Sequence, residues 1–180
     1  MSFPLLPTSR LLLRAFLPWD ADVVQTLAGE RDVAVNTLNV PHPYPDGVAA
    51  QWIASHGPAW EKRSCLVLAI TTEDEGVVGA ISLQLQPRHH RGEIGYWIGK
   101  PFWGRGYATE AAAAIVDLGF DHLDLNRIEG RHLVRNPASG RVLQKVGMLT
   151  EGVHRELVHV WGSFEDVATL AVLRSGRTPS

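Results

Sequence analysis

The sequence has few features of secreted, membrane-bound or nucleic-acid-binding proteins. Its 180 residues include a single cysteine, Cys65, which excludes a disulfide within the chain. A net charge of −2 provides no strongly basic surface for nucleic acids or membranes. No segment approaches the roughly 18 apolar residues of a membrane helix, and residues 1–10 lack the pattern of a secretory signal. We therefore expect a cytoplasmic protein without nucleic-acid or membrane partners.

Several catalytic and metal-binding motifs are missing as well. The eight histidines include no His-x-x-x-His pair, and the adjacent side chains of His89 and His90 would diverge in an extended chain, so we expect no metal. No Gly-x-Ser-x-Gly sequence occurs, which argues against the nucleophile elbow of serine hydrolases. Cys65 begins the apolar run 65–70, and this favours a core position over a nucleophilic role.

The composition is that of a globular domain, with 45% hydrophobic and 20% charged residues. We expect one domain over residues 1–174 and a frayed tail over 175–180. Apolar patterning predicts strands at 10–14, 66–71, 77–85, 93–98, 127–134, 152–160 and 166–173. It predicts helices from Pro18, over 48–53 with a restart near Trp60, over 107–120 and over 138–146. Strand 93–98, helix 107–120 and strand 127–134 form a β-α-β unit, which predicts a parallel strand pair.

A glycine pair marks the start of the clearest helix. Gly104 and Gly106 stand between a predicted strand and the helix that begins at Tyr107. The first N–H groups of a helix lack internal partners and carry partial positive charge, so they form an anion site. Glycine lets the backbone approach a phosphate closely, and Arg105 adds a cation. The alternative is a glycine-rich turn that only starts the helix.

The glycine pair differs from two known phosphate-binding motifs. No Gly-Lys-Ser or Gly-Lys-Thr follows it, as a nucleoside-triphosphate loop would require. Thr109 occupies the place of the third glycine in the dinucleotide fingerprint.

Five segments in this order resemble the GNAT superfamily of N-acetyltransferases, and within it the RimJ/RimL type. They are Thr8–Arg14, Glu93–Ile98, Trp103–Ala111, Asn136–Met148 and Trp161–Val167. The resemblance covers nearly the whole chain. It implies an α/β GNAT fold with a mixed, mostly antiparallel sheet of about seven strands, a splayed parallel pair and about four flanking helices.

The resemblance also implies acetyl-coenzyme A as the cosubstrate and an amine as the acceptor. The loop that would hold the pyrophosphate comprises Trp103, Gly104, Arg105, Gly106, Tyr107, Ala108 and Thr109. Unpaired backbone groups at Trp97, Ile98 and Gly99 would bind the pantetheine arm where the parallel strands diverge. Asn136 would bind the same arm or cap the following helix.

Acetyl transfer needs a neutral amine and a proton for the departing thiolate. Glu93 is the candidate general base, and the alternative is a solvent-facing glutamate near a strand start. Ser139 is the candidate acid by resemblance, and the alternative is a helix cap. Many family members carry a tyrosine acid at the position of Leu143, and leucine has no proton to donate.

The acceptor stays open at this level. A protein N-terminus and a small amine or antibiotic are both compatible with the resemblance, as are a monomer and a homodimer. We expect loop 41–46 and hairpin 161–163 to shape the acceptor pocket. Leu143 keeps open a different class, a non-catalytic module that binds or senses acyl-coenzyme A.

Overall fold

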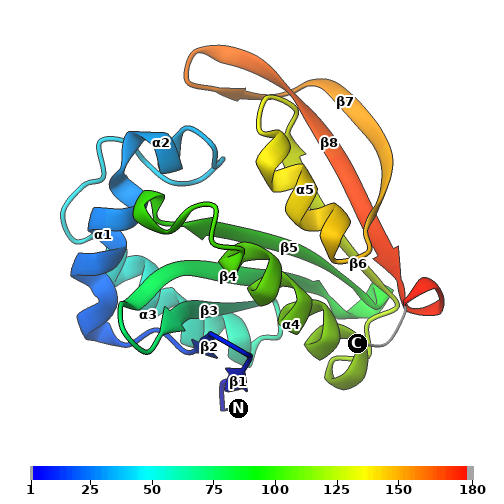
Figure 1. Ribbon diagram of the computed structural model, residues 1–180, viewed down its shortest axis with the longest axis horizontal. Helices are drawn as coiled ribbons and strands as arrows, with labels where there is room; N and C mark the ends of the chain where they lie inside the picture. The colour runs from blue at the N-terminus through cyan, green and yellow to red at the C-terminus, as the bar shows by residue number, and fades with distance from the viewer. Residues whose placement is uncertain (1, 178–180) are drawn as a thin grey trace.

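The computed structural model describes residues 2–177, which form one eight-stranded sheet covered by helices (Figure 1). The strands are β1 (Leu6–Pro7), β2 (Leu12–Arg14), β3 (Cys65–Thr72), β4 (Gly76–Gln86), β5 (Arg91–Ile98), β6 (Arg127–Leu133), β7 (Leu149–Val160) and β8 (Ser163–Leu173). Their order across the sheet is β1-β2-β3-β4-β5-β6-β8-β7. Every neighbouring pair is antiparallel except β5 and β6, which confirms the predicted parallel pair.

The α-helices lie on both faces of this sheet. They are α1 (Ala21–Gly29), α2 (Arg31–Ala34), α3 (Val48–Glu61), α4 (Tyr107–His122) and α5 (Pro137–Lys145). Strand β3 shows how both faces are filled, since Leu66 and Leu68 join the core cluster under α4 while Val67 and Ala69 join the cluster under α1 and α3. A strand buried on both faces reads as a continuous apolar run, as residues 66–71 do.

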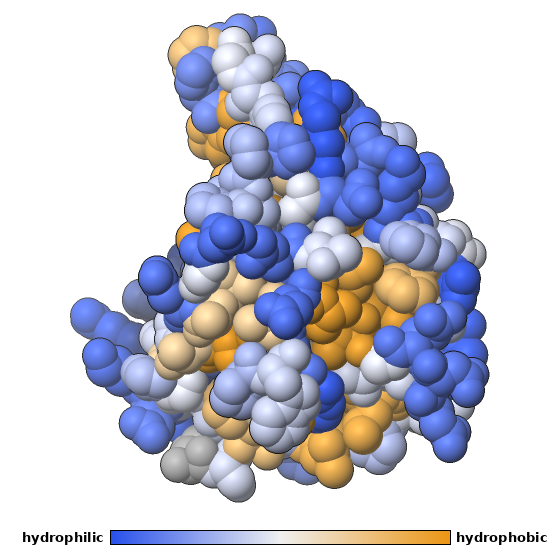
Figure 2. All heavy atoms as spheres, turned by 90° about the vertical axis from the view of Figure 1, so that its left-hand side faces the viewer, coloured by the Kyte–Doolittle hydropathy of each residue, from blue (hydrophilic) through white to orange (hydrophobic). Residues whose placement is uncertain are grey.

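The β7–β8 hairpin extends beyond the rest of the sheet (Figure 1). In the view from the α1 side it stands above the body, and hydrophobic side chains are exposed below it (Figure 2). Val153, Leu157 and Phe164 are among the exposed apolar residues of this hairpin. Within residues 2–177 no helix has the length and apolar character needed to cross a membrane.

Parallel pairing of β5 with β6 is short. It joins Arg91 to Arg127 and ends at Ile94 opposite Gly130, although both strands continue beyond this point. The strands therefore diverge, and a gap opens between their carboxyl ends. Helices α4 and α5 both begin at this edge of the sheet, because each follows one of the two strands in the chain.

Three details of the expected secondary structure need correction. Strand β1 and helix α2 were not expected, because two and four residues are too short to show a hydrophobic period. Helix α3 runs without interruption through Gly57 and Pro58, where the sequence predicted a break. The clash that excludes a helical residue before proline involves its Cβ in part, and Gly57 has none. Buried Trp60 then anchors the last turn in the core.

The end of the described chain is tied to α4. Arg174–Gly176 form a 3-10 turn, and Arg177 pairs with Asp117 at 2.7 Å and with Asp121 at 2.6 Å. The frayed tail that the sequence predicted from residue 175 therefore includes residues with defined partners. Its last part, 178–180, lies outside the described residues.

Buried His56 makes stability sensitive to mild acid. Its ring lies 4.4 Å from the Trp52 ring and 5.5 Å from the Phe16 ring, and neither ring nitrogen has a hydrogen-bond partner among the described residues. Burial lowers the pKa of His56 to about 4. The unfolded chain takes up a proton below about pH 6.5, whereas the folded chain resists protonation until about pH 4.

We predict that the free energy of unfolding falls between pH 7.5 and pH 4.5, and that His56 accounts for about 2 kcal/mol of this fall. Urea unfolding of the His56→Leu variant should show a correspondingly weaker pH dependence. The exposed His89→Asn variant is the control and should keep the full dependence. An unchanged dependence in His56→Leu would contradict the assignment.

Candidate active site

The start of α4 has the geometry of an anion site. Gly104 and Gly106 have φ angles of +76° and +83°, a left-handed backbone conformation that residues with a Cβ adopt rarely. Gly106 is the N-cap of the helix, and the following N–H groups, from Tyr107 to Thr109, are the ones that a helix leaves unpaired. The loop therefore needs glycine for its backbone conformation, in addition to any close approach of the backbone to a phosphate.

A network of hydrogen bonds fixes this loop from the other end of the chain. Glu110, in the first turn of α4, accepts hydrogen bonds from the Thr8 hydroxyl at 2.7 Å, from the Ser9 hydroxyl at 2.9 Å and from the Arg10 N–H at 2.8 Å. The Arg10 guanidinium bridges Glu110 at 2.6 Å and donates to the Arg105 carbonyl at 2.9 Å. Although partial burial opposes the shift, these donors hold the pKa of Glu110 at about 2.

A cavity of about 360 Å³ opens at this helix start, and we call it the loop cavity. Its lining includes the loop residues Trp103, Gly104 and Gly106, and the first residues of α4. Arg141 and Lys145 of α5 line its opposite side. The site thus combines helix N–H groups with two basic side chains, a suitable environment for phosphates.

The side chain of Arg105 lies elsewhere than the sequence suggested. Its guanidinium lies over the Phe102 ring, 5.4 Å from the centroid, and donates to the Pro101 carbonyl at 3.2 Å. It is exposed and does not line the loop cavity. The cations on this cavity come instead from α5, which the sequence analysis missed. The spacing of Arg141 and Lys145 by four residues, which places them on one helix face, was the available signal.

Backbone groups at the end of β5 also differ from expectation. The Gly99 N–H donates to the Val78 carbonyl at 2.9 Å, so this pair is hydrogen-bonded within the sheet. Because such pairs alternate along antiparallel strands, the backbone groups of Trp97 face β4 too. The groups of Tyr96 and Ile98 face the gap instead. The expectation that Trp97 and Gly99 offer unpaired backbone groups in the gap is therefore wrong.

The Ile98 carbonyl already has a partner in the gap. It accepts the indole N–H of Trp103 at 2.6 Å. The Ile98 N–H and the backbone of Tyr96 are the remaining groups at this edge. The side chains of Trp97 and Ile98 nevertheless line the loop cavity.

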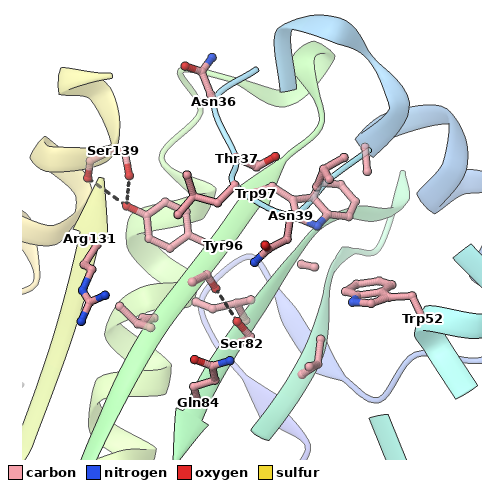
Figure 3. Close-up of a pocket in the computed structure, with 18 of the residues that line it drawn as sticks. Asn36, Thr37, Asn39, Trp52, Ser82, Gln84, Tyr96, Trp97, Arg131 and Ser139 are labelled. Carbon is pink, nitrogen blue, oxygen red and sulfur yellow. Dashed lines mark hydrogen bonds between the residues drawn. The ribbon is translucent and has the colours of Figure 1, made fainter. Parts of the chain in front are cut away.

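Tyr96 connects β5 to the first turn of α5. Its hydroxyl lies 2.9 Å from the Ser139 hydroxyl and donates to the Ser139 carbonyl, also at 2.9 Å (Figure 3). Burial raises the pKa of Tyr96 to about 12, although the contact with Ser139 acts in the opposite direction. The sequence analysis did not select Tyr96, because nothing in the local pattern shows which helix its side chain meets.

The structure separates the two roles that the sequence left open for Asn136 and Ser139. Asn136 caps α5, since its side-chain oxygen accepts the Ser139 N–H at 3.3 Å. The Ser139 hydroxyl faces Tyr96 instead of capping the helix. Leu143 is fully buried and packs against Gly130, where a Cβ would come within 2.6 Å of its side chain.

A second cavity, of about 440 Å³, lies on the α1 side of the gap, and we call it the acceptor cavity. Segment 36–41 forms one wall, and Trp52 lies on another (Figure 3). The ring of His42 lies 5.6 Å from that of Trp161, so the loop after this wall contacts the β7–β8 hairpin. Cys65 packs against the core cluster under α1 and α3 and also lines this cavity. Burial raises the pKa of its thiol, which disfavours the nucleophilic thiolate.

Glu93 lines the acceptor cavity beside a cation. Its carboxylate lies 3.6 Å from the Arg131 guanidinium, which is also 3.7 Å from Glu129. Glu93 and Tyr96 are three residues apart on β5, about 10 Å along an extended strand. The backbone positions of Glu93 and Tyr96 are therefore too far apart for direct contact between neighbouring groups, and only an intervening water could link them by hydrogen bonds.

The two cavities share part of their lining. Asn36, Thr37, Tyr96, Trp97 and Ser139 border both of them. A molecule that enters from the α4 loop and a molecule in the acceptor cavity would therefore meet at Tyr96 and Ser139. Among residues 2–177, no three His, Cys, Asp or Glu side chains gather as a metal site would require.

Comparisons with known proteins agree on one family. The model for the acetyltransferase (GNAT) domain matches residues 10–149. The uncharacterized N-acetyltransferase p20 of Bacillus licheniformis is 30% identical over 93% of this chain and 94% of its own length. The structure of a GNAT-family acetyltransferase from Bacillus anthracis has a TM-score of 0.85 at 24% identity, covering 96% of this chain and 99% of that one. RimL, a ribosomal L7/L12 α-N-protein acetyltransferase in complex with coenzyme A, has a TM-score of 0.86 at 18% identity, covering 97% and 100%.

We predict that Glu110→Gln loosens the α4 loop, because it removes the negative charge that pairs with Arg10. The expected loss is on the order of 1.5–3 kcal/mol in the free energy of unfolding, with faster hydrogen exchange at residues 104–110. Urea unfolding and hydrogen-exchange mass spectrometry measure these effects. Asp121→Asn, near the far end of the same helix, is the control and should leave exchange at 104–110 unchanged. Unchanged exchange in Glu110→Gln would contradict a role of the network in the loop.

Proposed function

Because this chain belongs to the acetyltransferase (GNAT) family, we propose that it transfers the acetyl group of acetyl-coenzyme A to an amine in a ternary complex. The observation that carries the proposal is the meeting of two cavities at Tyr96 and Ser139. One cavity starts at a helix N-terminus suited to phosphates, and the other is a separate chamber for an acceptor. Direct transfer between two bound molecules needs such a junction.

The loop cavity is the proposed seat of coenzyme A. The pyrophosphate would bind the N–H groups at the start of α4, with Arg141 and Lys145 supplying positive charge. The pantetheine arm would follow the gap between β5 and β6, where the Ile98 N–H and the Tyr96 backbone face it. The coenzyme A complex of RimL, which has the same fold, supports this choice of cosubstrate.

The chemistry follows from the groups at the junction. The attacking nitrogen must lose a proton, and Glu93 would receive it through water. The departing thiolate must gain a proton, and the Ser139 hydroxyl would provide it, because Leu143 has no proton to donate. No covalent enzyme intermediate is required, since the amine attacks the thioester carbonyl directly.

The acceptor is proposed as a protein N-terminus, by analogy with RimL and the RimJ/RimL type. A cavity of about 440 Å³ accepts one or two residues, and the chain behind them would leave along the β7–β8 hairpin. A small amine is the second candidate. The contact of His42 with Trp161 favours it, because this contact joins the loop after segment 36–41 to the β7–β8 hairpin, along which a longer chain would have to leave.

Release of coenzyme A in the presence of amines tests the proposal. A thiol-reactive dye would follow turnover with peptides that have free or blocked N-termini and with a panel of small amines. Amine-dependent release, with a product heavier by one acetyl group, would support transfer. Tight coenzyme A binding without release for any amine would favour the alternative, a non-catalytic acyl-coenzyme A sensor.

We predict that Gly106→Val lowers coenzyme A affinity at least 100-fold, because a branched Cβ forces the left-handed residue out of position and occupies the phosphate seat. Gly104→Val should act in the same direction. Calorimetry on folded protein is the measurement. Gly162→Val, at φ +78° in the hairpin turn, imposes similar strain elsewhere and should bind normally. Normal affinity in Gly106→Val would remove the pyrophosphate from this loop.

We predict that Glu93→Gln preserves coenzyme A affinity and slows turnover by about 10–100-fold at pH 6.5. The loss should shrink above pH 8, because an α-amine with a pKa near 8 is then mostly neutral and needs no base. The pH–rate profile is the measurement. Glu129→Gln, which changes the other neighbour of Arg131 and does not line the acceptor cavity, is the control. A profile parallel to wild type would make Glu93 structural.

A further inference from the structure

Tyr96 occupies a position that its packing alone does not explain. Its ring packs at the edge of the core cluster, but its hydroxyl lies at the border of both cavities. The only side-chain group within hydrogen-bond distance of this hydroxyl, among the described residues, is the Ser139 hydroxyl at 2.9 Å. A phenylalanine would fill the same core space, so the hydroxyl is the feature that needs a function.

We propose that Tyr96 and Ser139 form a two-step proton relay, in which Tyr96 supplies Ser139 with the proton that Ser139 gives to the leaving thiolate. This inference rests on the proposed function. It assigns the source of the proton that Leu143 cannot donate. Ser139 contacts the sulfur and is the catalytic residue. Tyr96 acts through Ser139, so it is a positioning residue that also replenishes the proton.

The geometry allows only one productive orientation. The Ser139 hydroxyl has a single hydrogen, which must point at the sulfur to be transferred. Its oxygen then accepts from Tyr96, whose hydroxyl lies at the right distance. The Ser139 carbonyl competes for the Tyr96 proton at 2.9 Å, but within a regular helix that carbonyl also accepts the N–H of residue 143. The serine oxygen is therefore the acceptor that depends on Tyr96.

The relay conserves protons and charge. When the tetrahedral intermediate collapses, the carbon–sulfur bond breaks and the sulfur keeps the electron pair. The sulfur takes the Ser139 hydroxyl proton, and the Ser139 oxygen takes the Tyr96 proton in the same step. Tyr96 is left as a phenolate, which bulk water reprotonates. The proton lost by the amine leaves separately, through water to Glu93.

Burial raises the pKa of Tyr96 to about 12, so its hydroxyl stays protonated while the amine reacts. The same burial makes Tyr96 a weaker acid than a free thiol, which has a pKa of about 8.5. Proton transfer to the sulfur is therefore unfavourable by itself, and cleavage of the carbon–sulfur bond and reprotonation of the phenolate from water drive it forward. The phenolate formed is a strong base and returns to the protonated state without a further group.

The test is a double-mutant cycle on Tyr96→Phe and Ser139→Ala in the full-length protein. Single-turnover acetyl transfer should slow by about 100-fold in each variant, and the double variant should be no slower than either single one. Coenzyme A affinity, measured by calorimetry, should stay within threefold of wild type. Ser55→Ala, which removes an exposed hydroxyl of α3 that lines neither cavity, is the control and should react normally.

Other outcomes would overturn the relay. Losses that multiply in the double variant would mean that the two hydroxyls act independently. A normal rate in Ser139→Ala with a slow Tyr96→Phe would make Tyr96 the direct donor. A normal rate in Tyr96→Phe would mean that Tyr96 only packs against its neighbours and has no part in proton transfer. None of these results bears on amine-dependent release by the wild-type protein, which tests the proposed function separately.

A solvent isotope measurement distinguishes proton transfer from simple positioning. A plot of the transfer rate against the fraction of D₂O in the solvent should be curved for the wild type, because two protons move in one step. Ser139→Thr, which keeps a hydroxyl, should retain the curvature. Tyr96→Phe should give a straight line, since one proton remains. A straight line in the wild type would overturn the relay.

Discussion

The site depends on the early end of pairing between β5 and β6. Their hydrogen bonds stop at Ile94 and Gly130, although both strands continue. Parallel strands place their carboxyl ends, and the helices that follow them, at the same edge. The N-termini of α4 and α5 therefore flank one gap, and the two cavities meet inside it. A sheet paired to its end would close this space.

Helix α5 holds the gap open from one side. It packs tightly on β6, because Gly130 leaves room for Leu143 and Gly140 leaves room for the ring of His132. Across the gap, the helix is attached to β5 by the Tyr96 hydroxyl at Ser139. The same hydroxyl lies 2.9 Å from the Ser139 hydroxyl, so it links the strand to the helix and also makes the contact that would carry the proton. The attachment of α5 to β5 and the proposed proton transfer thus depend on the same Tyr96 hydroxyl.

The polar groups of the site are arranged in three separate environments. The α4 loop is stabilised by an ion pair between exposed Arg10 and partly buried Glu110, which joins the first residues of the chain to the start of α4. The junction at Tyr96 has a pair of hydroxyls 2.9 Å apart, which suits proton transfer. Glu93 and Arg131 lie further along the strands, where they line the acceptor cavity.

The sequence by itself determined the local elements and the glycine loop. Periodicity, prolines and the glycines at 104 and 106 predicted most of the strands, the long helix and the position of its first turn, because these features depend on neighbours in the chain. The tertiary structure alone decided which distant groups meet. It moved Arg105 away from the loop cavity, brought Arg141 and Lys145 to it, and placed Tyr96 beside Ser139, 43 residues away. Contacts between a strand and a helix that far apart arise from how the sheet diverges, and no local pattern records that divergence.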